Sequence, residues 1–209
     1  MDDWKRCLGV FAAAVLLLAT PADARRVKRG GAKNPVRQAA CVAECDTVRN
    51  LIYMIGDGMG LAHVTMLQIA EGYDNPVSFM RAENVALIKS YSRNNRVTDS
   101  AAAGTALATG HKTNNSMLGV LPDSTAVESM MAKAVRRGMA TGLVVTCYLP
   151  HATPGAFYAH QVYRRTLEPI AEQLVESGVD VAFGGGKRYF TARRADGTTL
   201  VDRLRTKGY

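Results

Sequence analysis

Ser100 stands directly after Asp99, in a stretch of small residues that would leave its hydroxyl accessible to a substrate. A serine hydroxyl is a poor nucleophile at neutral pH unless a base or a metal ion helps to remove its proton. No G-x-S-x-G motif surrounds Ser100, and the sequence has only 4 histidines, so a serine-histidine-aspartate triad is a weak candidate. Metal activation is the better hypothesis for Ser100. The competing interpretation is structural: Asp99 caps a helix and Ser100 lies in its first turn.

Two further polar clusters could join Ser100 in a site. Asp57 lies between glycines directly after an apolar run, where a carboxylate could hold a metal ion or cap a helix. The other cluster contains His151 and Thr153, with Arg164 a short distance further along the chain. Its structural interpretation is a helix start with Thr153 as N-cap and Pro154 at the first helical position.

Strands alternate with helices along the chain, which predicts an α/β fold with a mostly parallel central sheet and helices on both faces. Ligands of such sheets gather at the carboxyl ends of the strands, where loops and helix N-termini present polar groups. No internal repeat is visible. The pattern predicts strands at 51–55, 85–88, 142–147 and 179–183, and helices at 59–71, 98–109, 124–137 and 167–177.

Together with two further motifs, the polar clusters resemble motifs of the alkaline phosphatase family in residue identity, order and spacing. The five motifs are Ile-Gly-Asp-Gly-Met-Gly (55–60), Val-Thr-Asp-Ser-Ala-Ala (97–102), Ala-Thr-Gly-His-Lys-Thr (108–113), His-Ala-Thr-Pro (151–154) and Phe-Gly-Gly-Gly-Lys-Arg-Tyr-Phe (183–190). Any one of them would be a weak signal. Their shared order makes the resemblance specific and implies an alkaline-phosphatase-like fold.

The resemblance implies metal-dependent hydrolysis of phosphate monoesters with two zinc ions and one magnesium ion. Ser100 is similar to the nucleophile that takes the phosphoryl group, with zinc stabilising its alkoxide. Asp57 resembles the carboxylate that bridges a zinc and the magnesium, and Thr153 the hydroxyl ligand of magnesium. Arg164 resembles the guanidinium that binds two phosphate oxygens. His151 stands where one branch of the family has aspartate and others histidine, so its contact with metal is tentative.

The resemblance also implies zinc ligands after the glycine turn at 184–186, where the family places most of them. Residues 191–209 include Asp196 and Asp202 but no histidine. A zinc site takes about four ligands, at least three of them from the protein. We therefore expect a domain incomplete at its C-terminus, and homodimers when the protein is full length.

Two other functions stay open at this point. The first is a truncated, catalytically inert chain that at most binds phosphate or one magnesium ion through Asp57, Thr153 and Arg164. The second is a relative that cleaves phosphodiesters or sulfate esters. Such relatives commonly use threonine or a modified residue as nucleophile, so Ser100 with Arg164 favours small phosphate monoesters as substrates.

The amino-terminal residues predict export. Lys5 and Arg6 precede an apolar run over 8–19, and Ala22-Asp23-Ala24 has the pattern of a cleavage site, so 1–24 is predicted to be a signal peptide. The run is shorter than the roughly 20 residues that a bilayer-spanning helix needs. A lipoprotein signal is disfavoured because Cys7 precedes the run. We expect a secreted or periplasmic protein without a stable membrane anchor.

A basic stretch follows the predicted cleavage site near Ala24. The net charge is +8, and much of the excess lies in 25–47, which we interpret as a flexible lead before the folded part at 48–209. No aromatic residues interleave with these charges, so nucleic-acid binding is not expected. Cys41 and Cys45 could form a disulfide or contribute to a metal site, and Cys147 is expected to be buried.

Overall fold

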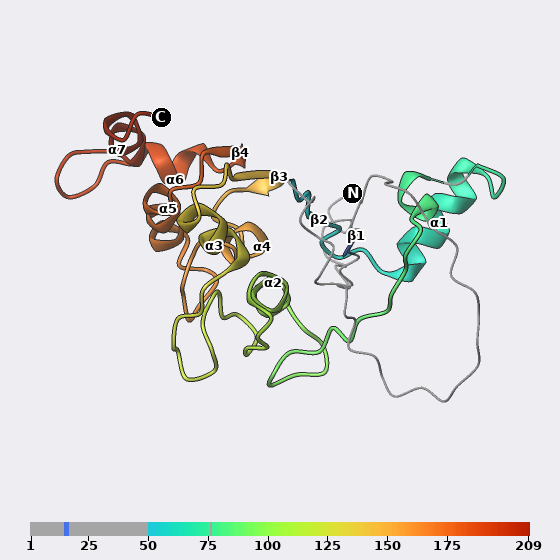
Figure 1. Ribbon diagram of the computed structural model, residues 1–209. Helices are drawn as coiled ribbons and strands as arrows, with labels where there is room; N and C mark the ends of the chain where they lie inside the picture. The colour runs from blue at the N-terminus through green and yellow to red at the C-terminus, as the bar shows by residue number, and fades with distance from the viewer. Residues whose placement is uncertain (1–14, 17–49, 76) are drawn as a thin grey trace, which may run out of the picture.

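The computed structural model describes residues 15–16, 50–75 and 77–209, and it has an α/β architecture (Figure 1). Strand β3 (Gly142–Tyr148) pairs in parallel with β4 (Val181–Gly185). Strand β2 (Met54–Ile55) pairs antiparallel with β1 (Val15–Leu16). The parallel connection between β3 and β4 confirms the predicted fold class, because parallel strands need a crossover, here through α4 and α5.

Helices account for most of the remaining regular structure and agree with the predicted alternation. The helix predicted at 167–177 forms and ends before Gly178, which has a φ of 73°. The helices are α1 (Leu61–Glu71), the 3-10 helix η1 (Ser78–Arg81), α2 (Ser100–Thr109), α3 (Met130–Arg136), α4 (Ala152–Gly155), α5 (Leu167–Glu176), α6 (Lys187–Thr191) and α7 (Leu200–Thr206).

The core lies among α2, α4 and α5, and small residues allow its helices to approach closely. Ala101 and Ala108 on α2 are buried, and a methyl group added at Gly104 would lie 3.0 Å from the Cβ of Ala156. On α5, Ile170 and Leu174 are buried on one side of the helix. This packing fixes the N-terminus of α2, where Ser100 lies.

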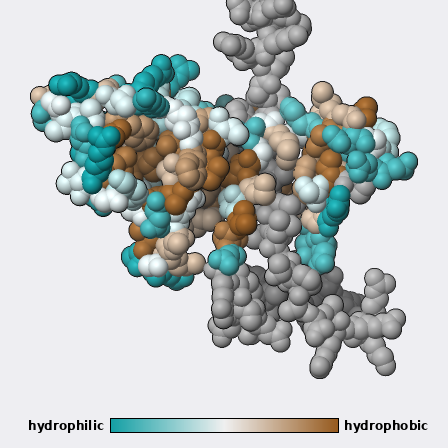
Figure 2. Space-filling view, turned by 90° about the horizontal axis from the view of Figure 1, so that it is seen from above, coloured by the Kyte–Doolittle hydropathy of each residue, from teal (hydrophilic) through white to brown (hydrophobic). Residues whose placement is uncertain are grey.

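Strand β3 buries one face and exposes the other. Leu143 is buried, whereas the side chain of Val144 next to it is 78% exposed, as a period of two predicts. Phe183 on β4 pairs in register with Val144 and is also exposed. Figure 2 shows hydrophobic residues gathered in the middle of the molecule on the face that it presents.

Three expected elements differ from the structure. Residues 85–88 form no strand, because no backbone in the described part of the chain pairs with them, and Val85 and Leu87 are exposed. Helix α3 begins after Ser129, which caps it, because Ser124 upstream adopts a φ of 70° in a turn. His151 occupies the N-cap position of helix α4, so the interpretation of Thr153 as N-cap is wrong.

Helix α1 lies apart from helices α2 to α7 (Figure 1). It buries none of its residues, and the side chains of Leu61 and Met66 are 77% and 67% exposed. The predicted signal peptide and basic lead fall, except for Val15 and Leu16, outside the described residues and stay predictions, as does any pairing of Cys41 with Cys45. Within the described ranges, no helix has the length and apolar character needed to cross a bilayer.

Tyr158 links the core to the strand end and gives the fold a predicted sensitivity to alkali. Its hydroxyl donates to the backbone oxygen of Leu149 at 2.7 Å, and burial raises its pKa well above the usual value. The unfolded tyrosine loses its proton above about pH 10, while the folded one keeps it. The free energy of unfolding should therefore fall by about 1.4 kcal/mol for each pH unit above pH 10.

Replacing Tyr158 with phenylalanine should remove this loss of stability. Below pH 9 the variant should be about 1 kcal/mol less stable than the parent, because the hydrogen bond is lost. At pH 11 the difference should vanish or change sign. Urea unfolding at both pH values checks this, with Tyr73→Phe as control because Tyr73 is 72% exposed. A constant difference between parent and Tyr158→Phe across this pH range would contradict the prediction.

Candidate active site

Asp57 and Ser100 reach the site from two different backbone turns. Asp57 follows β2, and the next residue, Gly58, has a φ of 77°, a conformation that favours glycine. Ser100 is the first residue of α2 and is 4% exposed. Asp99 caps this helix by accepting a hydrogen bond from the backbone nitrogen of Ala102 at 2.9 Å, as the structural interpretation of Asp99 expected.

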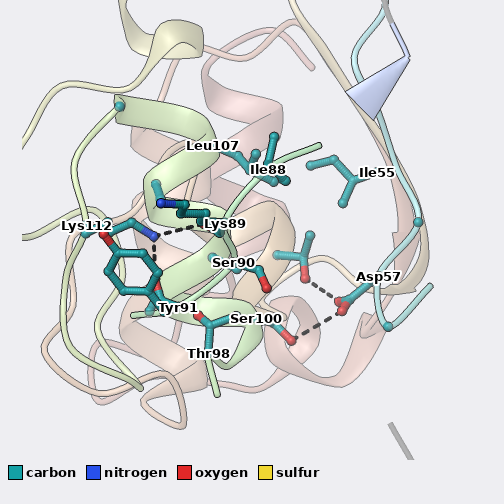
Figure 3. A pocket seen from close by; sticks show the side chains of 18 residues that line it. Ile55, Asp57, Ile88, Lys89, Ser90, Tyr91, Thr98, Ser100, Leu107 and Lys112 are labelled. Atoms are coloured by element: carbon teal, nitrogen blue, oxygen red, sulfur yellow. Dashed lines mark hydrogen bonds between the residues drawn. The ribbon is translucent and has the colours of Figure 1, made fainter. Parts of the chain in front are cut away.

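Two hydroxyl groups meet on the carboxylate of Asp57 (Figure 3). Ser100 Oγ lies 3.4 Å from Asp57 Oδ1, and Thr153 Oγ1 donates to Asp57 Oδ2 at 2.5 Å. Thr153 comes from α4, which the packing against α2 holds in place. The structure therefore brings together three of the residues singled out in the sequence, from segments far apart along the chain.

A cavity of about 240 Å³ opens beside these hydroxyl groups, and Asp57, Ser100 and Thr153 belong to its lining. The opposite wall is the irregular segment 88–91. Lys112 holds this segment, because its ammonium group donates to the backbone oxygens of Lys89 and Tyr91 and lies 3.7 Å from the centre of the Tyr91 ring (Figure 3). These contacts substitute for the strand pairing that the segment lacks.

Arg164 is bound to the neighbour of Ser100. Its Nη1 lies 3.1 Å from Asp99 Oδ2, and both side chains are about one fifth exposed, at 22% and 21%. Its Nη2 lies 3.3 Å from His151 Nε2. The guanidinium group is thus held next to the N-terminus of α2. Its geometry allows bidentate binding of an anion. Sequence reasoning identified Asp99 only as a cap and missed its ion pair, since the two residues are 65 positions apart.

His151 is positioned to accept rather than to donate. Burial lowers its pKa, and the positive charge of Arg164 lowers it further, against an opposing effect of Asp57. A neutral imidazole offers a lone pair on only one nitrogen, whereas Arg164 at Nε2 and the backbone nitrogen of Thr153 at Nδ1, 3.5 Å away, are both donors. The shorter, charge-assisted contact favours a lone pair at Nε2. A metal contact of His151 would compete with Arg164 and stays a prediction.

The donor set around Asp57 suits a magnesium ion. A carboxylate and two hydroxyl groups are hard oxygen ligands, which magnesium prefers together with water. The set does not suit zinc, which takes at least three protein ligands, commonly histidine, cysteine or carboxylate. Within the part of the chain that the structure describes, no three such residues come together to hold a metal. The described residues therefore do not fit either of the two expected zinc ions.

A second, larger cavity of about 900 Å³ is lined by residues of the β2 segment and β3. Cys147 belongs to its lining and is a free thiol of intermediate exposure, less buried than expected. Burial raises its pKa, and the charge of Asp57 acts in the same direction. The thiol is therefore neutral near pH 7 and is not an activated nucleophile.

Comparisons with known proteins agree on one family. The family model described as alkaline phosphatase matches residues 48–209. Alkaline phosphatase 4 of Bacillus subtilis (strain 168) is 36% identical over 175 residues, which cover 78% of this chain and 37% of the relative. Alkaline phosphatase of Escherichia coli (strain K12) is 34% identical over 192 residues, covering 77% of this chain and 41% of the relative.

Solved structures give the same result. Alkaline phosphatase from the Antarctic bacterium TAB5 is 38% identical with a TM-score of 0.65, covering 72% of this chain and 43% of that one. A mutant of the TAB5 enzyme, solved with Mg bound in its M3 site, has a TM-score of 0.62 at 36% identity and covers 68% of this chain and 41% of that chain. This chain spans about two fifths of the length of the curated relatives it matches, between 37% and 41% in the two cases above.

Proposed function

Because the chain belongs to the alkaline phosphatase family, we propose that it carries the nucleophile and phosphate-binding part of a metal-dependent enzyme that hydrolyses phosphate monoesters through a phosphoserine at Ser100. The observation that supports this most is the meeting of the Ser100 and Thr153 hydroxyl groups on the Asp57 carboxylate. The serine at the start of α2 thus lies beside oxygen atoms that could ligate a cation.

In the proposed reaction, Ser100 Oγ attacks the phosphorus atom of the substrate. A bond forms between Oγ and phosphorus while the bond between phosphorus and the alcohol oxygen breaks, and the serine proton passes to solvent or to the departing alcohol. Water then cleaves the phosphoserine and releases inorganic phosphate. Arg164 would bind two phosphate oxygens throughout, held in orientation by Asp99.

Asp57 and Thr153 would hold magnesium, with the Ser100 hydroxyl beside them. A bound dication supplies positive charge near the serine oxygen and the phosphoryl group, which lowers the cost of ionising a hydroxyl. Residues beyond those described would have to supply most of the zinc ligands that the family resemblance implies.

A second candidate function is a catalytically inert chain that binds phosphate or one magnesium ion. It is supported by the oxygen donors around Asp57, which suit one magnesium ion, and by the lack of a three-residue zinc group among the described residues. This candidate needs only Asp57, Thr153 and Arg164. It predicts binding without turnover.

One assay separates the two candidates. The 209-residue chain and the product of the gene read beyond codon 209 are each given p-nitrophenyl phosphate with zinc and magnesium at alkaline pH. We expect turnover by the longer product that chelation abolishes and that zinc with magnesium restores. Turnover by the 209-residue chain would exclude the inert candidate. An inactive longer product would overturn the proposal that the protein is a phosphatase. p-Nitrophenyl sulfate and bis-p-nitrophenyl phosphate are assayed in parallel. They test whether the protein instead cleaves sulfate esters or phosphodiesters.

We propose small phosphate monoesters as the substrates, export to the periplasm or the medium as the location, and a homodimer as the assembly of the full-length protein. The homodimer is supported by family membership and by the exposed apolar side chains of α1, such as Leu61, Met66 and Ile69. No stable membrane anchor and no nucleic-acid partner are proposed.

A further inference from the structure

A tight turn at Asn115 and Ser116 contacts both the segment that carries the nucleophile and the segment that carries Arg164. The side chain of Asn115 acts on residues 97–99: its Nδ2 donates to the backbone oxygen of Val97 at 3.0 Å, and its Oδ1 accepts from the backbone nitrogen of Asp99 at 3.2 Å. One side-chain amide thus donates to one backbone group and accepts from another, as a backbone amide of a paired strand would. The backbone of the segment directly before Ser100 is therefore hydrogen-bonded to this amide.

The backbone of Ser116 connects the same region to Arg164. Its nitrogen donates to Asp99 Oδ2 at 2.9 Å, and its oxygen accepts from the backbone nitrogen of Arg164 at 2.8 Å. Ser116 has a φ of 74°, a left-handed conformation that non-glycine residues rarely adopt. Such a conformation persists only where the surrounding contacts impose it, and it is common at functional sites.

The turn is anchored firmly on both sides. The backbone oxygen of Thr113, which is fully buried, accepts from Arg93, and Leu118 exchanges backbone hydrogen bonds with Gln161. Leu118 is also fully buried in the core. The contacts of Asn115 and Ser116 therefore connect the site to a rigid frame.

We propose that Asn115 and Ser116 are positioning residues that fix the spacing between Ser100 and Arg164. The proposal rests on the proposed phosphoryl transfer, since spacing matters only if a phosphate bridges the two groups. Neither residue touches the substrate. Asn115 acts through the backbone before Ser100, and Ser116 acts through the Asp99 carboxylate and the backbone of Arg164.

The kinetic test uses the metal-loaded longer product. Asn115→Asp keeps an acceptor for Asp99 but loses the donor to Val97, so kcat should fall by about tenfold or more while KM stays within about twofold. Asn114→Asp places the same charge one residue away and should leave kcat within about twofold of the parent. Calorimetric titration with inorganic phosphate counts the folded sites, so a lower kcat at unchanged stoichiometry separates positioning from loss of fold.

A second measurement does not depend on activity. In the 209-residue chain, Asn115→Ala should speed amide hydrogen exchange at both Asp99 and Arg164 by about tenfold or more, whereas Asn114→Ala should speed neither. Unchanged exchange at Arg164 would overturn the positioning proposal even if the enzyme is active. An inactive longer product with the exchange effect present would overturn the proposed function and support the connection between the two segments.

Discussion

Replacing Ser100 with alanine is expected to abolish phosphate-monoester hydrolysis by the metal-loaded longer product. The change removes the only atom that could form the phosphoserine, so kcat should fall by on the order of 10⁴-fold or more. Folding should be almost unaffected, because the hydroxyl contact with Asp57 is long, at 3.4 Å, and alanine fits the first turn of α2. Loss of activity would therefore report on chemistry and not on structure.

Ser90 offers the matched control for this variant. It lines the same cavity, and Ser90→Ala makes the same chemical change there. We expect its kcat to stay within about twofold of the parent. Acid quenching during turnover, followed by mass spectrometry of the peptide containing residue 100, should detect the phosphoserine in the parent and in Ser90→Ala. Equal rates for the parent and Ser100→Ala would eliminate Ser100 as nucleophile.

The second large effect is expected at Gly119. This residue has a φ of 59°, and an added Cβ would lie 2.2 Å from the backbone oxygen of Ala159 and 2.8 Å from His160 Nδ1. Neither side can easily move, because Gly119 donates to Thr105 Oγ1 and accepts from the backbone nitrogen of Val127. Conformational strain and overpacking together should make Gly119→Ala less stable by about 3 kcal/mol or more.

Gly110 separates the two contributions. Its φ of 78° is similar, but nothing lies within 4 Å of an added Cβ. Gly110→Ala should therefore lose only the conformational part, about 1 kcal/mol. Urea unfolding of both variants at pH 7 checks the difference. If Gly119→Ala and Gly110→Ala lowered the free energy of unfolding equally, the close contact with Ala159 would contribute nothing to the loss of stability.

Local signals in the sequence predicted most of the described elements because capping and periodicity depend on neighbouring residues. Asp99 as the cap of α2 and Gly178 after α5 are of this kind. The strand expected at 85–88 is wrong for the opposite reason: its apolar residues suit a strand, but pairing depends on a distant partner that the described chain does not place there.

The site divides in the same way. The motifs identified Asp57, Ser100 and Thr153, and the structure brings these three side chains together. The ion pair of Asp99 with Arg164 and the double contact of Asn115 were not predicted, because each depends on two segments meeting in space. Asn115 lies next to a recognisable motif, but an asparagine in a loop carries no signal of what its amide will contact.

The meeting of hydroxyl groups on Asp57 also bears on the order in which the chain folds. The contact with Thr153 spans 96 residues, whereas the contact with Ser100 spans 43. Closing such long loops costs entropy before any contact forms, and contacts between distant residues slow folding. We expect the local helices to form first and the two hydroxyl contacts on Asp57 to close last, so that binding competence marks the end of folding for this chain.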